Sequence, residues 1–291
     1  MMVLVALLAC TDAVVPTPDD SAPLTSWSYD EEREPPLYDA AQIEAQAADR
    51  LPQLLGIDPY PLYDAYNLAM SAQDRDCPST YEIAGVIGWG AECSSASGWS
   101  YWGRSQGLYV QHAAVEGVQY ETYGTLLTNA RMTSPDGEQL YIVGYSDLTE
   151  TLDGSRRVIY SYLLGEFSWD GPGSEGTWLT DSLAVSLIVD SSWEPSGARS
   201  LRIDGGVASV GKDNPTLNAL DLVMTSAEAG ASCTAEPTGA LQLVTRDPQT
   251  YDITFDGTAC DGCGEVSYHG EDLGPACFDF SEMLDWEGRP W

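Results

Sequence analysis

Hydrophobic residues occur in short runs from about residue 80 onward. The runs contain Val, Ile, Leu, Tyr and Trp, and Gly, Asp, Ser and Pro separate them, which is the pattern of β-strands. The best strand candidates are residues 108–112, 139–145, 158–164, 183–189, 200–203, 219–224, 241–244 and 251–255. We find no sequence repeat, so the pattern does not favour a propeller or a solenoid.

Asp-Gly pairs are expected to form turns between these strands, because both residues tolerate positive φ. The six pairs start at Asp136, Asp153, Asp170, Asp204, Asp256 and Asp261. The first three are spaced by 17 residues, an interval that we expect to hold two strands and an opposite turn. The pattern therefore predicts a mainly β protein with an antiparallel meander sheet, either curled or folded into a sandwich.

Two short helices are predicted before the strands. Apolar residues recur every four positions from Ile43 to Leu51, which predicts a helix over 38–55. Pro52 should end or kink this helix, because proline lacks the backbone N–H that continues the hydrogen-bond ladder. A second helix is predicted from about 61–72. We expect both helices to pack on one face of the sheet.

The N-terminal ten residues are apolar and uncharged, and an acidic, Pro-containing segment follows them. A spanning helix needs about 20 apolar residues, so this run is typical of a signal peptide instead. Its end, Leu7-Leu8-Ala9-Cys10, looks like a lipobox, in which the cysteine is acylated and becomes the new N-terminus. No basic residue precedes it, which indicates a start placed too far downstream. The alternative is a buried N-terminal strand in which Cys10 is an ordinary thiol.

Four segments follow from these patterns. We expect a signal peptide and lipobox in 1–10, a disordered acidic tether in 11–36, a helical segment in 37–76 that packs on the β domain, and a disulfide-stapled β domain in 77–291. The residue after the cysteine is Thr11 rather than aspartate, which by analogy with the enterobacterial sorting rule favours the outer membrane. A periplasmic or cell-surface location is the other expectation, with the membrane contacted through the lipid anchor.

The chain contains seven cysteines, an odd number that requires an explanation in an exported protein. Lipidation of Cys10 leaves six, which fits three disulfides in an oxidising compartment. The six are Cys77, Cys93, Cys233, Cys260, Cys263 and Cys277. Spacing separates the first two from the rest, so we expect them to pair. The other four allow three connectivities; a hairpin over 240–257 favours Cys233 with Cys260, which leaves Cys263 for Cys277.

Two alternatives exist for Cys260-Asp261-Gly262-Cys263. A zinc site with Cys233 and Cys277 has one CxxC half, but its other half lacks paired spacing. A thioredoxin-like redox pair needs its first thiol at a helix N-terminus, whereas the residues after Cys263 predict a turn and a short strand over 265–268. Neither alternative is favoured over disulfides.

Charge excludes several partners. The 45 acidic and 12 basic residues give a net charge of −33. Binding to nucleic acid requires Lys and Arg to displace counterions from phosphates, and anionic membrane surfaces attract the same residues, so neither is expected as a partner. Hydrophobic residues at 43% and aromatic residues at 10% are enough for a sizeable core, which excludes wholesale disorder.

We assign no catalytic residue from the sequence. Gly103-Arg104-Ser105-Gln106-Gly107 matches GxSxG, but the residues after it alternate like a strand, whereas a hydrolase elbow is followed by a helix. A hairpin turn is the favoured interpretation, and a secreted hydrolase using Ser105 or a carboxylate pair is the alternative function. Neither His112 nor His269 lies in a metal-binding motif.

Two binding hypotheses remain. Trp99, Tyr101 and Trp102, with Trp89 nearby, are candidates for an aromatic platform that holds sugar rings or peptide, although tryptophan in sheets often packs in the core instead. The second hypothesis is a Ca²⁺ site, with weak candidate ligands Asp252, Asp256 and Asp261; no EF-hand or nonapeptide pattern organises these acids, and solvated turn residues are the alternative. A glycan or an envelope protein is the expected partner, and the sequence leaves the oligomeric state open.

Several motifs also resemble a group of uncharacterised exported lipoproteins of myxobacteria and related bacteria. The similarity covers most of 77–280 beyond the lipobox. The matching motifs are Cys77-Pro78, Gly88-Trp89-Gly90, Cys260-Asp261-Gly262-Cys263-Gly264 and Gly274-Pro275-Ala276-Cys277. The resemblance implies an envelope-anchored, disulfide-stapled β domain and no known activity. We therefore expect a lipid-anchored cell-envelope protein whose β domain is non-catalytic and serves binding or structure.

Overall fold

The computed structural model describes residues 34–83, 86–115, 118–153, 156–194, 197–211, 214–226, 235–257 and 259–284. The chain divides into two units, Met1–Pro35 and Pro36–Trp291, and the helices and strands lie in the second. Cys10 and nearly all of the predicted tether lie outside the described residues.

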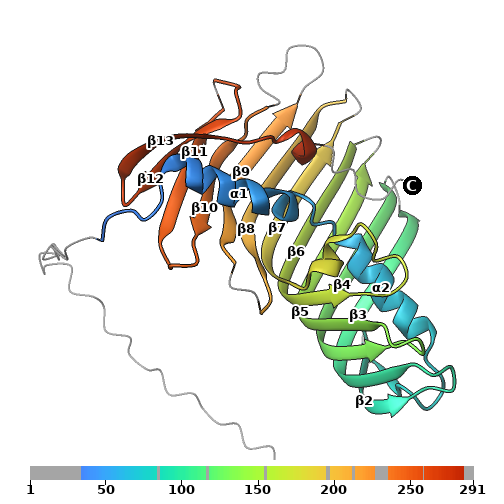
Figure 1. The fold of residues 1–291 in the computed structure, drawn as a ribbon. Coiled ribbons are helices and arrows are strands. Elements are labelled where there is room, and N and C mark those ends of the chain that lie inside the picture. Colours follow the sequence, from blue (N-terminus) through green and yellow to red (C-terminus); the bar gives the residue numbers. More distant parts are fainter. Residues whose placement is uncertain are drawn as a thin grey trace, which may run out of the picture. The chain divides into compact units, whose positions relative to one another are not determined.

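Thirteen strands of the described chain form one antiparallel sheet, in which every strand pairs with its neighbours in sequence (Figure 1). The strands are β1 (Thr80–Ile83), β2 (Val86–Ser94), β3 (Ser100–Val115), β4 (Val118–Thr133), β5 (Gln139–Asp153), β6 (Arg156–Trp169), β7 (Leu183–Trp193), β8 (Arg199–Ser209), β9 (Thr216–Ser226), β10 (Thr238–Val244), β11 (Thr250–Asp256), β12 (Cys263–Tyr268) and β13 (Glu271–Cys277). The helices are α1 (Ala40–Leu55) and α2 (Tyr60–Ser71), with short 3-10 turns η1 (Trp178–Asp181) and η2 (Ser281–Leu284). The predicted meander is confirmed, and the described strands belong to one sheet rather than to a sandwich.

The strands are longer than the sequence pattern predicted. All eight predicted candidates lie within strands, but β3 and β4 each have 16 residues. The Asp136 turn joins β4 to β5, and Asp153 ends β5, so a 17-residue interval holds one strand instead of the two we expected. The physical reason is that buried residues recur on one side of β5 from Leu140 to Glu150, including polar Ser146 and Glu150, without a turn signal between them.

Two segments predicted as turns lie inside strands. The Asp204-Gly205 pair is in β8 at a β-bulge, where the register with β9 shifts. Gly205 has a φ of +107°, and a Cβ there would collide with the Ser186 carbonyl oxygen. The segment 103–107 lies in the middle of β3, so its prediction as a hairpin turn is wrong. Its glycines allow close approach between strands; a Cβ on Gly103 would collide with β4 backbone.

The two predicted helices are present, and Pro52 lies within α1 rather than ending it. A capping box starts α1: Gln42 N–H donates to the Asp39 side chain, and Asp39 N–H donates to the Gln42 side chain. Pro52 is tolerated in the last turn because Leu51 and Leu54, on either side of it, remain buried against the sheet. The helix ends at Leu55, and Gly56 caps it by donating its backbone N–H to the Pro52 carbonyl oxygen.

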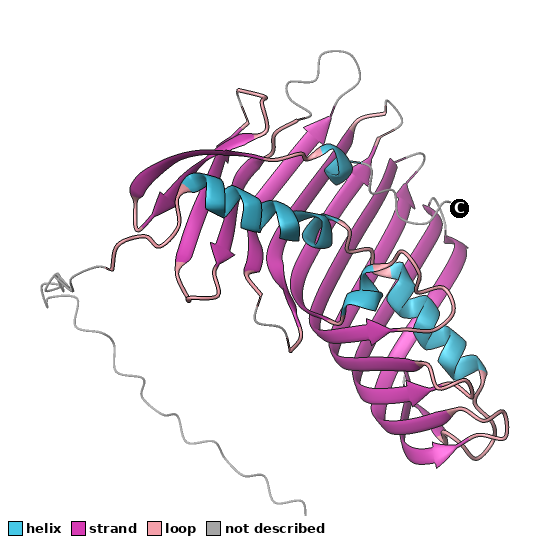
Figure 2. Cartoon of the chain, viewed as in Figure 1, coloured by secondary structure: helices cyan, strands magenta, loops and turns pink. Residues whose placement is uncertain are grey.

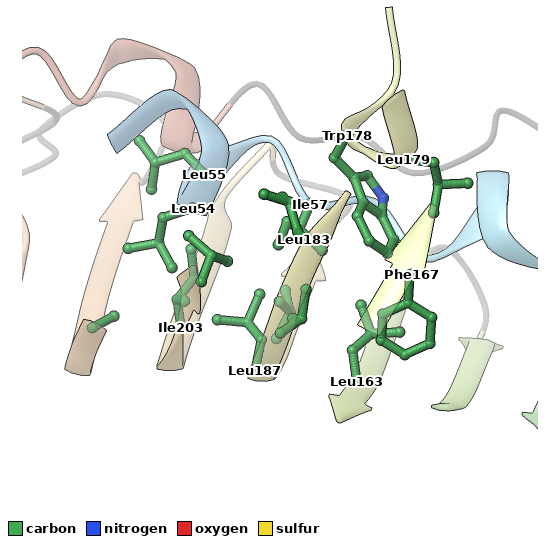
Figure 3. Packing of buried hydrophobic residues seen from close by; sticks show 14 of the residues in the cluster. Leu54, Leu55, Ile57, Leu163, Phe167, Trp178, Leu179, Leu183, Leu187 and Ile203 are labelled. Carbon is green, nitrogen blue, oxygen red and sulfur yellow. The ribbon is translucent and has the colours of Figure 1, made fainter. Parts of the chain in front are cut away.

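Both helices lie on the same side of the sheet (Figure 2). Helix α1 contacts β8, β9 and β13, and α2 contacts β5. Figure 3 shows part of the core between these layers, where Leu54 and Ile57 meet Leu183, Leu187 and Ile203 from the strands. Each fully buried Leu or Ile stabilises the fold by about 1.5–3 kcal/mol, so this interface holds the helices in place.

The opposite side of the sheet, which we call the open face, is more exposed. Along β7, Leu183, Val185 and Leu187 are buried beneath the helices, whereas the alternating Ser186 is exposed. Large side chains nevertheless occur on the open face, and Leu127 is 57% exposed. Exposed aromatic and aliphatic groups on a regular sheet face are a feature that often marks a binding surface.

Candidate functional site

An aromatic and arginine-containing surface lies on the open face of β1, β3 and β4. Residues directly opposite each other on paired strands share a face, and every second residue of a strand returns to that face. The β3–β4 register therefore places three pairs side by side: Trp102 with Arg131, Arg104 with Asn129, and Gln106 with Leu127. Together with Tyr81 of β1, we call these residues the aromatic–arginine surface.

These side chains are accessible and border two depressions. Trp102 is 50% exposed and Tyr81 is 45% exposed. A depression of about 330 Å³ is lined on the open face by Tyr81, Arg104, Gln106, Leu127 and Asn129. A second, of about 250 Å³, is lined by Glu92, Ser94, Ser100, Trp102, Arg131 and Thr133, among others. The two depressions follow one another along the β3–β4 pair, with Trp102 and Arg104 between them.

Neither arginine of this surface is neutralised by the described residues. Other arginines form ion pairs: Arg202 Nε lies 2.6 Å from Asp221 Oδ1, and Arg156 Nε lies 2.7 Å from Glu194 Oε1. The side chains of Arg104 and Arg131 form no ion pair or hydrogen bond with any residue in the described ranges. In a chain with a net charge of −33, two exposed, unpaired guanidinium groups mark this surface as locally favourable for an anion.

Tyr81 is held in position by its neighbours on β2 and β3. Gln106 Nε2 donates a hydrogen bond of 3.1 Å to Tyr81 Oη. The ring lies over Gly88, directly opposite Tyr81 on β2, where a Cβ would collide with it. Glycine at position 88 therefore allows the ring to lie flat against the sheet as one wall of the larger depression.

Beneath the floor of the larger depression, on the covered face of the sheet, lies a buried polar network anchored by α2. Tyr66 Oη shares a 2.9 Å hydrogen bond with Ser105 Oγ, and Ser105 shares another of 2.9 Å with Thr128 Oγ1. Trp89 Nε1 donates to Tyr66 Oη over 3.2 Å. Burial raises the pKa of Tyr66, so this hydroxyl stays protonated at neutral pH. The network fixes the backbone on which Arg104 and Gln106 stand.

Two further tyrosines of α2 bind polar groups on the covered face of the sheet. Tyr63 Oη shares a 2.9 Å hydrogen bond with Ser146 Oγ. Tyr60 Oη donates to Glu150, whose other oxygen lies 2.5 Å from Arg157 Nε. Burial, then the charge of Glu150, raises the pKa of Tyr60. The tyrosines at positions 60, 63 and 66 share one helix face, so their hydrogen bonds specify how α2 sits on the sheet.

The aromatic platform predicted from the sequence does not form as one surface. Trp89, Trp99 and Tyr101 are buried in the core, at 1%, 8% and 1% exposure, and only Trp102 is exposed. Trp89 and Tyr101 pack edge to face with ring centroids 5.9 Å apart. The reason is the period of two: Tyr101 and Trp102 are adjacent in sequence and must point to opposite faces of the sheet.

The hydrolase alternative finds no support at Ser105. The serine is 1% exposed and lies within a strand, not on an elbow. Its hydroxyl partners are Tyr66 and Thr128, neither of which is a general base at neutral pH. Glu150, a buried carboxylate, is occupied by Tyr60 and Arg157.

Two predicted disulfides are confirmed, Cys77–Cys93 and Cys263–Cys277. Cys260 is disulfide-bonded as well, and its predicted partner Cys233 lies outside the described residues. The Cys263–Cys277 bond rules out both a four-cysteine zinc site and a redox pair between Cys260 and Cys263. These disulfides join β12 to β13 and attach the segment before β1 to β2.

The weak calcium candidates are not assembled into a site within the described ranges, where no group of three or more His, Cys, Asp or Glu side chains is placed to hold a metal. Asp252 Oδ1 accepts a hydrogen bond from Gln242, and Asp261 Oδ1 accepts one from the Cys263 N–H. The Asp261 interaction organises the turn before β12.

No family model, curated protein or solved structure matches the chain. Within the described residues, no helix is long and apolar enough to cross a membrane.

Sequence reasoning identified only one member of the aromatic–arginine surface, Trp102. The missed residues are Tyr81, Arg104, Gln106, Leu127, Asn129 and Arg131. A signal was present, because Trp102, Arg104 and Gln106 alternate as they must on one strand face. Treating 103–107 as a turn concealed that alternation.

Proposed function

We propose that this protein is an exported, lipid-anchored binding protein of the cell envelope, and that its β domain holds a saccharide on the aromatic–arginine surface. The lipobox cysteine Cys10 would supply the anchor, and 11–36 would space the domain from the membrane. The two disulfides among the described residues are consistent with an extracytoplasmic protein.

One observation carries the binding proposal: Trp102 stands half-exposed between two depressions on a rigid sheet. The flat, weakly polar face of an indole packs well against the C–H face of a sugar ring. Gln106 and Asn129 add amide donors and acceptors for hydroxyl groups, and the larger depression has a volume typical of small-ligand sites. These are groups that bind and orient a ligand.

The saccharide proposal is tested by comparing the wild type with Trp102→Ala. Isothermal titration calorimetry with two hexasaccharides, neutral maltohexaose and acidic hexagalacturonate, should detect binding to the wild type. Loss of the stacking face should weaken it about tenfold, equivalent to ~1.4 kcal/mol. Tyr160→Ala is the matched control, because Tyr160 is also a partly exposed aromatic residue of a strand, on β6. Equal weakening by both variants, or no binding of either saccharide, would refute the proposal.

The anchor is tested separately with Cys10→Ala in the full chain. The wild type should fractionate with membranes and the variant should be released into the soluble extracytoplasmic fraction, because the acyl chains are the proposed attachment. Unchanged fractionation of the variant would rule out lipid anchoring at Cys10 while leaving the saccharide proposal intact.

A further inference from the structure

The two unpaired arginines are close enough to act on one anionic group. Arg104 lies opposite Asn129, and Arg131 is two residues further along β4, which makes the two arginines diagonal neighbours across the strand pair. Diagonal neighbours have Cα atoms about 7–8 Å apart. Both guanidinium groups are cations on flexible stems, so both can reach an anion placed between them.

Arg104 and Arg131 differ from the paired arginines on β6 and β8 of this acidic chain. The chain carries 45 acidic residues against 12 basic ones, and the exposed arginines on β6 and β8 are engaged by Glu194 and Asp221. At the aromatic–arginine surface the nearby acid is Glu92, which lies opposite Trp102 and borders the smaller depression. It forms no ion pair with either arginine within the described chain. An anionic ligand can thus bind Arg104 and Arg131 as the carboxylates of Glu194 and Asp221 bind the arginines on β6 and β8.

The two depressions lie along β3 in a line long enough for several sugar rings. One includes Ser100 and the other Gln106, and these residues are six positions apart on the same strand face. At about 3.4 Å per residue the distance along the strand is about 20 Å. Trp102 and the two arginines lie between these ends. Such a line fits an extended ligand that runs along the strands.

The chemistry of the lining favours a saccharide over the other extended polyanions. Nucleic acid carries a phosphate at every residue and needs a row of basic side chains to replace its counterions, whereas this surface has two arginines. A peptide strand gains its affinity from backbone hydrogen bonds at a sheet edge, whereas β3 and β4 are interior strands whose backbone groups already pair with neighbours. What these strands offer is side chains: a stacking indole, amides and two guanidinium groups.

We infer that the aromatic–arginine surface binds an acidic polysaccharide, lying along β3 and β4 with an anionic group between Arg104 and Arg131. This inference rests on the proposed saccharide-binding function and names its ligand class. Trp102 stacks on a ring, the arginines bind its carboxylate or phosphate, and the two depressions receive the neighbouring rings.

The test uses calorimetry on the folded chain with defined probes. These are galacturonic acid oligomers of one to six rings, maltohexaose as the uncharged comparison, phosphopentamannose as a phosphate-bearing comparison, and a poly-glutamate peptide as an acidic non-saccharide. Hexagalacturonate or phosphopentamannose should bind at least tenfold more tightly than maltohexaose, and the tighter of the two identifies the anionic group. Single galacturonic acid should bind at least tenfold more weakly than the hexamer, because it occupies one depression only. Affinity should also fall as NaCl is raised from 20 to 500 mM.

Arginine variants provide the second arm. Arg104→Gln and Arg131→Gln should each weaken binding of the acidic saccharide about tenfold and leave binding of maltohexaose unchanged. Arg202→Gln is the matched control, because it removes an exposed strand arginine that is paired with Asp221. Circular dichroism and thermal melting verify that the variants fold. Equal effects of all three variants would refute the inference.

The outcomes separate this inference from the function it rests on. If maltohexaose binds as tightly as the acidic probes and Trp102→Ala abolishes both, saccharide binding holds and the acidic ligand class is wrong. If poly-glutamate binds more tightly than any saccharide and depends on both arginines, the ligand is an acidic peptide, and the inference is overturned. If no saccharide binds, the proposed function fails together with the inference.

Discussion

Removing the hydroxyl of Tyr66 is the sharpest test of how α2 supports the binding surface. In Tyr66→Phe the ring remains and the Oη atom is lost. Ser105 then keeps its hydrogen bond to Thr128, but the Trp89 indole N–H, in a side chain that is 1% exposed, loses its acceptor. A buried donor left without a partner costs about 1–3 kcal/mol of stability.

That cost translates into measurable shifts. For a domain of this size, 1 kcal/mol lowers the Tm by about 2–4 °C, so Tyr66→Phe should lower it by ~2–12 °C. Urea unfolding followed by tryptophan fluorescence should show a lower midpoint at an unchanged slope, since the surface exposed on unfolding is the same. The chain contains nine tryptophans, so the emission reports global unfolding.

Tyr81→Phe is the control, because it makes the same chemical change at an exposed position. Gln106 donates to Tyr81 Oη, but Tyr81 is 45% exposed and water can replace the lost hydroxyl. Its effect should stay within about 0.5 kcal/mol. If both variants lose the same stability, or if Tyr66→Phe is neutral, the claim that a buried network from α2 holds the floor of the site is wrong.

Three further predictions concern pH and the disulfides. Asp74→Asn should lower the Tm at pH 7, because three backbone N–H groups hold the pKa of Asp74 below its usual range. The difference from wild type should shrink in calorimetry as the pH falls through that lowered pKa; a constant difference down to pH 2 contradicts this. Burial raises the pKa of Tyr60 and raises that of Tyr101 to about 12. The contribution of the two protonated tyrosines to the free energy of unfolding is therefore complete below pH ~10 and is lost at higher pH. A free energy of unfolding that stays flat from pH 9 to 12 rules this contribution out. Reduction of the disulfides should lower the Tm more in 10 mM than in 1 M NaCl, because residues 240–291 hold eleven acids and two bases; equal losses exclude the link to charge repulsion.

Much of the fold followed from local patterns. Short apolar runs bounded by turn residues located strands such as β7, and the four-residue spacing from Ile43 located α1, because both patterns depend only on the local sequence. Cysteine spacing also predicted the pair Cys77–Cys93, and the expected hairpin over 240–257 favoured Cys263 with Cys277 among three connectivities; both bonds are present.

Element lengths and special glycines were less predictable. The Asp-Gly pair at 136 forms a turn, whereas the pair at 204 forms a bulge inside β8. Pro135 precedes the first pair and favours a turn, in which the Gly137 N–H donates to the Ser134 carbonyl oxygen. Ile203 precedes the second pair, and there the chain continues as a strand because β7 and β9 pair with it on both sides. Cross-strand pairing also kept Gly103 and Gly107 within β3.

The sequence by itself determined that this chain builds a meander of strands with two helices and cysteine pairs, because periodicity and short-range spacing are local properties of a polypeptide. Only the tertiary structure decided which face of the sheet the helices cover, and therefore that Tyr101 is buried while Trp102 is exposed. It also decided that Arg104 and Arg131, 27 residues apart in the chain, become diagonal neighbours. Strand register creates that proximity, and register depends on pairing along the full length of β3 and β4.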